Sequence, residues 1–124
     1  MKLVCLGLNH ETAPVEVRER FALSDVALDR ETETLMTAAE VEEGVVLSTC
    51  NRTEYYAVVN GESGIEELED WICKQRDYHG SREGVFYHYQ AREAAEHLCR
   101  VASGMNSMVL GETEIFGQVK KAYK

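Results

Sequence analysis

"EEGVVLSTCNRTEYYAVV" (residues 42–59) holds two runs of strand-forming residues on either side of a short polar joint. The runs 42–48 and 53–59 are rich in β-branched and aromatic residues, which favour strands. Cys50 lies in the joint, among small polar residues and two positions before Arg52. A buried cysteine usually behaves as a small hydrophobic residue, so the neighbours of Cys50 indicate a different role for its thiol.

The elements on either side of this pair follow a recognisable order. The sequence predicts a strand over 2–8, a short helix over 15–21 after Pro14, and a second helix that begins after Ser24 as N-cap. The apolar positions of that second helix are Val26, Leu28, Leu35, Met36 and Ala39. A turn over 60–64, a helix over 65–78 and an aromatic strand over 84–90 follow. The order β-α-β, β-α-β predicts an α+β fold with a ferredoxin-like split βαβ sheet.

Additional helices are expected toward the C-terminus. In 91–104 the apolar positions 94, 95, 98, 101 and 102 form one stripe, with His97 on its border. The segment 113–124 carries a further apolar face and is still in helical phase at residue 124. We therefore expect a segment of a longer protein, or a helix that ends against a partner.

Length and composition restrict the class of protein. A chain of 124 residues with 44% hydrophobic residues is expected to form one domain with a real core. The formal net charge of −9 argues against an unaided nucleic-acid platform, although RNA remains a possible substrate if another domain holds the phosphates. The sequence shows no signal peptide and no run long enough to span a membrane, so we expect a cytoplasmic protein. The cysteines at 5, 50, 73 and 99 lack regular spacing and are expected to be reduced.

Cys50 is the candidate nucleophile because a loop gives access, while Arg52, nearby hydroxyls and backbone N–H groups could stabilise its thiolate. The alternative is a half-buried thiol in an Asn-containing turn. Arg52 could bind a carboxylate with its bidentate fork, or form a surface ion pair. His97 could act as a general acid or base, or be a boundary residue satisfied by a neighbour.

Cofactor motifs are missing from the sequence. No two His, Cys or Asp residues have metal-chelating spacing, so no metal is expected. Neither GxGxxG after a strand nor GxxxxGK[ST] occurs, so no dinucleotide is expected to bind these residues. The polar segment 103–118 between two helices is either a packed functional loop or a plain linker.

Three stretches carry a resemblance to a known family. They are "LNHETAPVEVRE" (8–19), "VVLSTCNRTEYY" (45–56) and "HLCRVASGMNSMVLGETEIFGQVKKAY" (97–123). In this order and spacing they closely resemble the N-terminal catalytic domain of glutamyl-tRNA reductase, and the whole chain fits that domain end to end. The resemblance implies that residues 1–124 are the glutamyl-tRNA-binding catalytic domain, without the family's NADPH-binding and dimerisation domains.

The resemblance also implies a reaction. The family uses NADPH to reduce the activated glutamate of glutamyl-tRNA(Glu) to glutamate-1-semialdehyde, in tetrapyrrole (haem and porphyrin) biosynthesis. The cysteine that matches Cys50 attacks the aminoacyl ester and forms a thioester, which hydride then reduces. Without the NADPH domain, this chain alone is expected to stop before the reduction. The resemblance further implies a homodimer of the full-length protein and a possible contact with the next pathway enzyme, glutamate-1-semialdehyde aminomutase.

Site roles are carried over by motif. Cys50 and His97 are the implied catalytic residues, Arg52 and Thr49 bind the glutamyl group, and Asn51 and Glu54 brace the loop. The implied lining of the glutamate pocket is Ser107, Glu112 and Gln118. The sequence departs from the family's usual "GLDS" and "GEPQILGQ" at Asn106, Thr113 and Glu114, which affects the contacts with the substrate's amino group and not the thiol chemistry.

Two other functions remain open. A non-catalytic ferredoxin-like binding module would use 47–54 as a plain turn, and its Cys50 would alkylate no faster than a free thiol. A cysteine hydrolase of small acyl esters would turn over simple esters without tRNA, and would leave the 103–118 motif unexplained.

Overall fold

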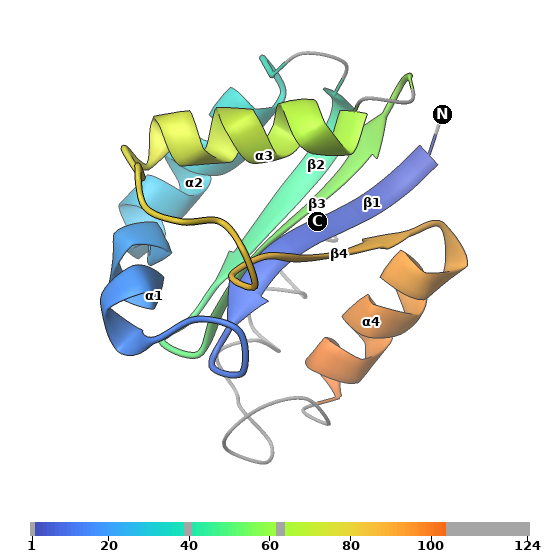
Figure 1. The fold of residues 1–124 in the computed structure, drawn as a ribbon. Coiled ribbons are helices and arrows are strands. Elements are labelled where there is room, and N and C mark those ends of the chain that lie inside the picture. The colour runs from blue at the N-terminus through green and yellow to red at the C-terminus, as the bar shows by residue number, and fades with distance from the viewer. Residues whose placement is uncertain (1, 39–40, 62–63, 104–124) are drawn as a thin grey trace.

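A four-stranded antiparallel sheet forms the centre of the molecule (Figure 1). The structure is a computed structural model and describes residues 2–38, 41–61 and 64–103. The strands are β1 (Lys2–Asn9), β2 (Val41–Ser48), β3 (Arg52–Val59) and β4 (Tyr87–Gln90), in the spatial order β2-β3-β1-β4. Each half of the chain therefore places its two strands around a strand of the other half, which is the predicted split βαβ arrangement. The α+β class and the sheet order are confirmed.

Four helices accompany the sheet in the described residues. They are α1 (Val15–Phe21), α2 (Asp25–Leu35), α3 (Gly64–Gln75) and α4 (Arg92–Ala102). The predicted N-cap of α2 is confirmed, since the Ser24 hydroxyl accepts a hydrogen bond from the Ala27 N–H. None of the described helices is long and apolar enough to cross a membrane.

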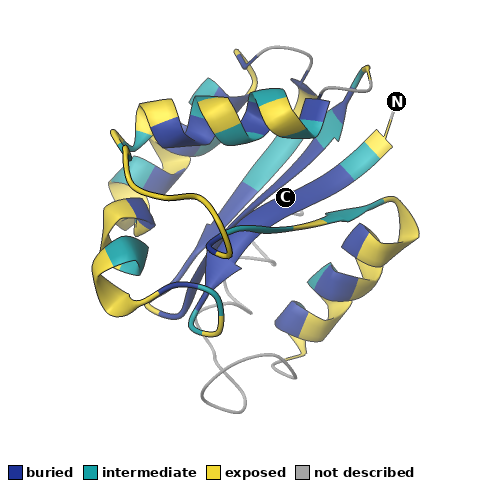
Figure 2. Cartoon of the chain, in the orientation of Figure 1, coloured by how far each residue is buried: buried dark blue, intermediate teal, exposed yellow. Residues whose placement is uncertain are grey.

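The two faces of the sheet carry separate hydrophobic cores. The larger core joins the sheet to α1, α2 and α3, and Phe21 lies at its centre with Tyr78 and Phe86 rings 5.1 and 5.4 Å away. The smaller core joins the other face to α4 through Cys5, Ala94 and Val101, among others. Figure 2 shows the buried side of α4 turned toward the sheet. Because strand side chains alternate between faces, Tyr55 and Ala57 of β3 lie in the larger core and Tyr56 lies in the smaller core.

Several element boundaries and stripes differ from prediction. Strand β4 begins at Tyr87 rather than 84, because a turn precedes it: Gly84 has φ +73° and the Val85 N–H donates to the Arg82 carbonyl. In the second helix Val26 and Met36 are 71% and 44% exposed, so their assignment to the apolar face is wrong. Leu28 and Leu35 are buried as predicted. Ala39 and the predicted helix over 113–124 lie outside the described residues.

Candidate functional site

The turn between β2 and β3 is held by a compact set of hydrogen bonds. The Thr49 N–H donates to the Arg52 carbonyl, the Asn51 N–H donates to the Thr49 hydroxyl, and the His10 N–H donates to the Asn51 carbonyl. Thr49 and Asn51 are buried, whereas Cys50 between them is exposed. The local sequence thus fixes the backbone around a thiol that solvent reaches, as a nucleophile requires.

Neighbouring helices also touch this turn. Arg18 of α1 places Nη1 3.5 Å from the Cys50 carbonyl oxygen. The Ser48 hydroxyl accepts from the Leu23 N–H and lies 3.1 Å from the Thr53 hydroxyl. Ser48, a candidate for stabilising the thiolate, is therefore engaged with residues on the α1–α2 side of the sheet.

All four cysteines are free, as predicted. Cys5 and Cys73 are buried in the two cores. Cys99 on α4 is exposed. Cys50 and Cys99 therefore offer a matched pair of accessible thiols, one in the turn and one on a helix.

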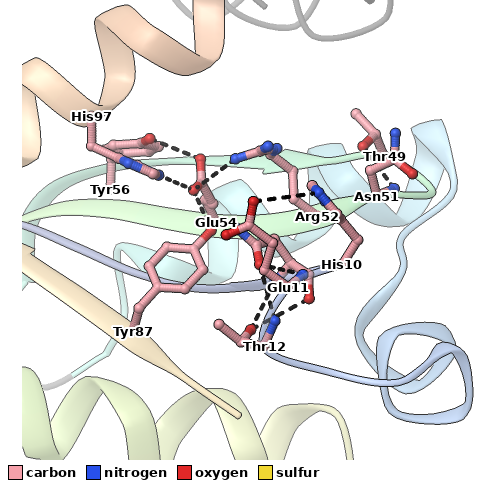
Figure 3. Close-up of polar contacts among 11 residues, drawn as sticks. His10, Glu11, Thr12, Thr49, Asn51, Arg52, Glu54, Tyr56, Tyr87 and His97 are labelled. Atoms are coloured by element: carbon pink, nitrogen blue, oxygen red, sulfur yellow. Dashed lines mark hydrogen bonds and ion pairs between the residues drawn. The ribbon is translucent and has the colours of Figure 1, made fainter. Parts of the chain in front are cut away.

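Arg52 lies at the start of β3 and is 1% exposed, which excludes the surface ion pair. Its Nη1 lies 3.5 Å from Oε2 of Glu54, two residues along the same strand. Residues i and i+2 of a strand share a face, so both side chains point to the side of the sheet that α4 covers. Figure 3 shows Arg52 between Glu54 and the Thr49–Asn51 turn.

Glu54 is the centre of a buried polar cluster (Figure 3). Its Oε1 accepts from the Tyr56 hydroxyl at 2.8 Å. Its Oε2 accepts from the Tyr87 hydroxyl and lies 2.5 Å from His97 Nε2. Glu54 itself is fully buried, so the ion pair with Arg52 and these hydrogen bonds offset the cost of removing its charge from water. Glu54 therefore does more than brace the loop, because its hydrogen bonds join β3, β4 and α4.

Gly7 on β1 makes this cluster possible. In the sheet register Gly7 lies opposite Glu54 of β3 on one side and opposite Tyr87 of β4 on the other. A Cβ at position 7 would lie 2.8 Å from Glu54 Cγ and 2.9 Å from the Thr53 carbonyl oxygen. The missing side chain therefore lets Glu54 and Tyr87 meet across the intervening strand.

His97 is 1% exposed and lies inside the face of α4 that packs on the sheet, not on its border. Its ring stacks on Tyr89 at 4.6 Å and contacts Tyr87 at 5.4 Å. The predicted stripe counted histidine as polar, and the pairing of His97 with Glu54 is what allows the imidazole to be buried. His97 Nδ1 is also buried and has no hydrogen-bond partner in the described part of the chain.

The electrostatics of the cluster favour an ionised Glu54. Burial on its own raises the pKa of Glu54, but the hydrogen bond and charge of His97, the Tyr87 hydroxyl and the charge of Arg52 lower it below its ordinary value. Burial and the nearby Glu54 charge raise the pKa of Tyr56 and of Tyr87. Both hydroxyls therefore remain protonated and serve as donors.

One set of possible metal ligands occurs in the described residues. Donor atoms of Cys5, Glu54 and His97 all lie within 4.8 Å of one another. The set fits a cation poorly, because Arg52 already places its positive charge beside Glu54, and burial raises the pKa of the Cys5 thiol far above its ordinary value. Sequence spacing could not find this group, since its members come from β1, β3 and α4.

The predicted site residues are brought together in part. Arg52 and His97 converge on Glu54, while Thr49 braces the turn that carries Cys50. Ser107, Glu112 and Gln118, like Asn106, Thr113 and Glu114, lie outside the described residues. Gly7 and Tyr87 were missed. A glycine inside an apolar strand was the available signal, since it often marks a close approach by another group.

The described strands do not form a dinucleotide-binding fold of the doubly wound type. NADPH sites of the doubly wound type need a parallel strand that leads through a glycine-rich turn into a helix. The sheet described here is antiparallel throughout. No step of hydride transfer is therefore assigned to these residues.

Comparisons with known proteins agree on one family. The family model described as glutamyl-tRNAGlu reductase, N-terminal domain, matches residues 6–124. A curated glutamyl-tRNA reductase of Akkermansia muciniphila is 49% identical over 126 residues, which cover 100% of this chain and 37% of that protein. The solved glutamyl-tRNA reductase from Methanopyrus kandleri superposes with a TM-score of 0.70 at 38% identity, over 98% of this chain and 27% of that one. The chain belongs to the family of glutamyl-tRNA reductase N-terminal domains.

Proposed function

We propose that this chain carries out the acyl-transfer half of a glutamyl-tRNA reductase, with Cys50 as the nucleophile. The observation that carries the proposal is the exposed thiol in a braced turn, two residues from a buried arginine, in a member of this family. The substrate is glutamyl-tRNA(Glu), and the family implies NADPH as the reductant in the whole protein. The product there is glutamate-1-semialdehyde, a tetrapyrrole precursor.

The proposed step converts the oxygen ester of glutamyl-tRNA(Glu) into a thioester on Cys50. The Cys50 sulfur attacks the carbonyl carbon of the aminoacyl ester, and a carbon–sulfur bond forms. The carbon–oxygen bond to the terminal ribose breaks, the ribose oxygen takes up the proton that the thiol loses, and tRNA leaves. The thioester that remains on Cys50 is a better hydride acceptor than the ester, which is the gain from covalent catalysis.

Arg52 is proposed to bind the side-chain carboxylate of the glutamyl group, and Thr49 to bind the glutamyl group beside it. The strong burial of Arg52 supports this role, because a guanidinium fork removed from water binds a carboxylate strongly and with defined geometry. The ion pair with Glu54 keeps the guanidinium in place before the substrate arrives. Ser107, Glu112 and Gln118 are proposed to complete the pocket, with His97 as the acid–base or positioning group.

The test is formation of the acyl-enzyme. Mixing the chain with glutamyl-tRNA(Glu) should raise its intact mass by one glutamyl group, with release of free tRNA. Cys50→Ser should lose the thioester, whereas Cys99→Ser should keep it, because Cys99 is an exposed thiol outside the turn. An adduct that survives in Cys50→Ala would contradict the proposal.

Two control experiments distinguish the proposed function from the two alternative functions. A binding module predicts that Cys50 and Cys99 react with an alkylating agent at similar rates and that no adduct forms. A hydrolase of small esters predicts turnover of simple acyl esters without tRNA. The proposal expects faster alkylation at Cys50 and no turnover of such esters.

A further inference from the structure

We propose that Glu54 is a positioning residue that holds His97 in the tautomer with hydrogen on Nε2, so that Nδ1 is the nitrogen that gains and loses the proton. The sequence does not indicate that Glu54 and His97 are partners, because 43 positions separate them. The inference rests on the geometry of the cluster, and only its use in acyl transfer rests on the proposed function.

The groups around Glu54 determine its charge. The polar groups of described residues that face its two oxygens are the Tyr56 and Tyr87 hydroxyls, the Arg52 guanidinium and the His97 imidazole. A guanidinium has no acceptor atom, and the two hydroxyls are already directed at the carboxylate. The Cys5 thiol from β1 lies close by and is neutral. Nothing in this set favours a protonated carboxyl group, so Glu54 is an anion that accepts hydrogen bonds.

The charge on Glu54 fixes the position of a proton on His97. Nε2 lies 2.5 Å from Oε2 of Glu54, a distance that requires a hydrogen between the two atoms. An ionised carboxylate has no hydrogen to give, so Nε2 must carry it. This holds whether the ring is neutral or cationic. Nδ1 is therefore the ring nitrogen that is left to accept or donate a further proton.

Two tyrosines and Glu54 hold the imidazole ring of His97. Tyr89 stacks on one face at 4.6 Å with an interplanar angle of 26°, and Tyr87 contacts the ring at 5.4 Å. Rotating the imidazole by half a turn about its bond to Cβ would replace Nε2 with a carbon and break the contact with Glu54. The two tyrosines thus fix the plane of the ring, and the Glu54 carboxylate selects its flip and its tautomer.

Nδ1 is the ring nitrogen of His97 that does not contact Glu54. A buried nitrogen without a partner is costly, and such groups usually have a functional explanation. His97 Nδ1 is in this state among the described residues. In the acyl transfer a proton must move from the thiol to the leaving ribose oxygen. With Nε2 held by Glu54, Nδ1 is the nitrogen through which His97 would take its proposed share in that transfer.

The tautomer can be read directly by NMR on the nitrogen-15-labelled chain. Long-range proton–nitrogen correlation spectra at a pH where His97 is neutral should show the pattern of a ring protonated at Nε2. His88, which is exposed on β4, serves as an internal reference. A spectrum in which His97 carries its hydrogen on Nδ1, or populates both tautomers as a solvated imidazole does, would overturn the proposal without any need for tRNA.

Two variants separate positioning from general loosening. Glu54→Gln removes the charge and adds a competing N–H, so we expect the tautomer of His97 to become mixed. Tyr87→Phe removes one donor to Glu54 and keeps the ring contact, so we expect it to keep the Nε2–H pattern. Equal tautomer mixtures in both variants would assign the effect to packing and contradict a specific role of Glu54. If Glu54→Gln does not fold, the spectra of the wild type and of Tyr87→Phe still show whether His97 carries its hydrogen on Nε2.

Discussion

At the scale of single residues, the buried carboxylate of Glu54 determines what its neighbours can do. It pairs with Arg52, fixes a nitrogen of His97, and accepts from two tyrosines. Each of these side chains would be costly to bury alone, and together they satisfy one another. Cys50 needs no such support, because its exposure follows from its place in a tight turn.

Acid should weaken the fold through Glu54. Its pKa lies below the ordinary value of 4.5, so its contribution to stability is complete above that value and is lost as pH falls through the folded-state pKa. We expect the free energy of unfolding, measured in urea titrations, to fall as the pH drops below this ordinary value of 4.5. Glu54→Gln should be less stable at neutral pH and lose less on acidification.

Glu66→Gln on the exposed side of α3 is the matched control and should follow the wild type across this range. An unchanged acid profile in Glu54→Gln would show that the carboxylate carries no net folding energy.

The site residues were predictable to different degrees. The polar neighbours of Cys50 indicated an exposed thiol, and the structure agrees. The burial of Arg52 and His97 could not be predicted, because a charged or polar side chain is buried only when a distant partner satisfies it. The alternation of Arg52, Glu54 and Tyr56 along one strand face was present in the sequence, but only the position of α4 shows that this face is covered.

At the scale of elements, three adjacent strands assemble the cluster through their register. Gly7 on β1 stands directly between Glu54 on β3 and Tyr87 on β4. A shift of one residue in either pairing would send these side chains to the other face of the sheet. The strands and their order were predictable from local propensity. The register was not, since it depends on how all four strands pack.

Adding a methyl group at position 7 should therefore disturb the cluster. Gly7→Ala places a carbon 2.8 Å from Glu54 Cγ, and we expect a loss of about 1–3 kcal/mol in the free energy of unfolding. The loss should be smaller in a Glu54→Ala background, because that variant lacks Cγ. A double-mutant cycle by chemical denaturation measures the coupling, which we expect to exceed about 0.5 kcal/mol. Additive effects would mean that the clash is with the backbone alone.

At the scale of the whole molecule, one sheet is shared by two cores. The helices α1, α2 and α3 cover one face and α4 covers the other, on which the polar cluster lies. The sequence indicated the order of the described helices and strands, yet the predicted strand over 84–90 began too early and the stripe on α4 was misplaced because His97 occupies a buried position. The two-core arrangement ties the candidate site to the packing of α4.

Both cores should unfold together, because each depends on the same strands. Phe21→Ala in the larger core should cost about 3–5 kcal/mol, and Val101→Ala in the smaller core about 2 kcal/mol. We expect each variant to lower the urea midpoint in a single transition that circular dichroism and tyrosine fluorescence report alike. Two separate transitions in Val101→Ala, with different midpoints for the two probes, would show that the smaller core unfolds separately.

The most direct test of the central claim is to locate the acyl group. The chain would be mixed with glutamyl-tRNA(Glu) carrying labelled glutamate, quenched in acid after short times, and digested for peptide mass analysis. We predict that the label appears on the peptide containing Cys50, is released by neutral hydroxylamine as a thioester should be, and is absent from the peptides of Cys5, Cys73 and Cys99. Label on any other residue, or a Cys50 peptide that stays unlabelled while tRNA is deacylated, would contradict the account.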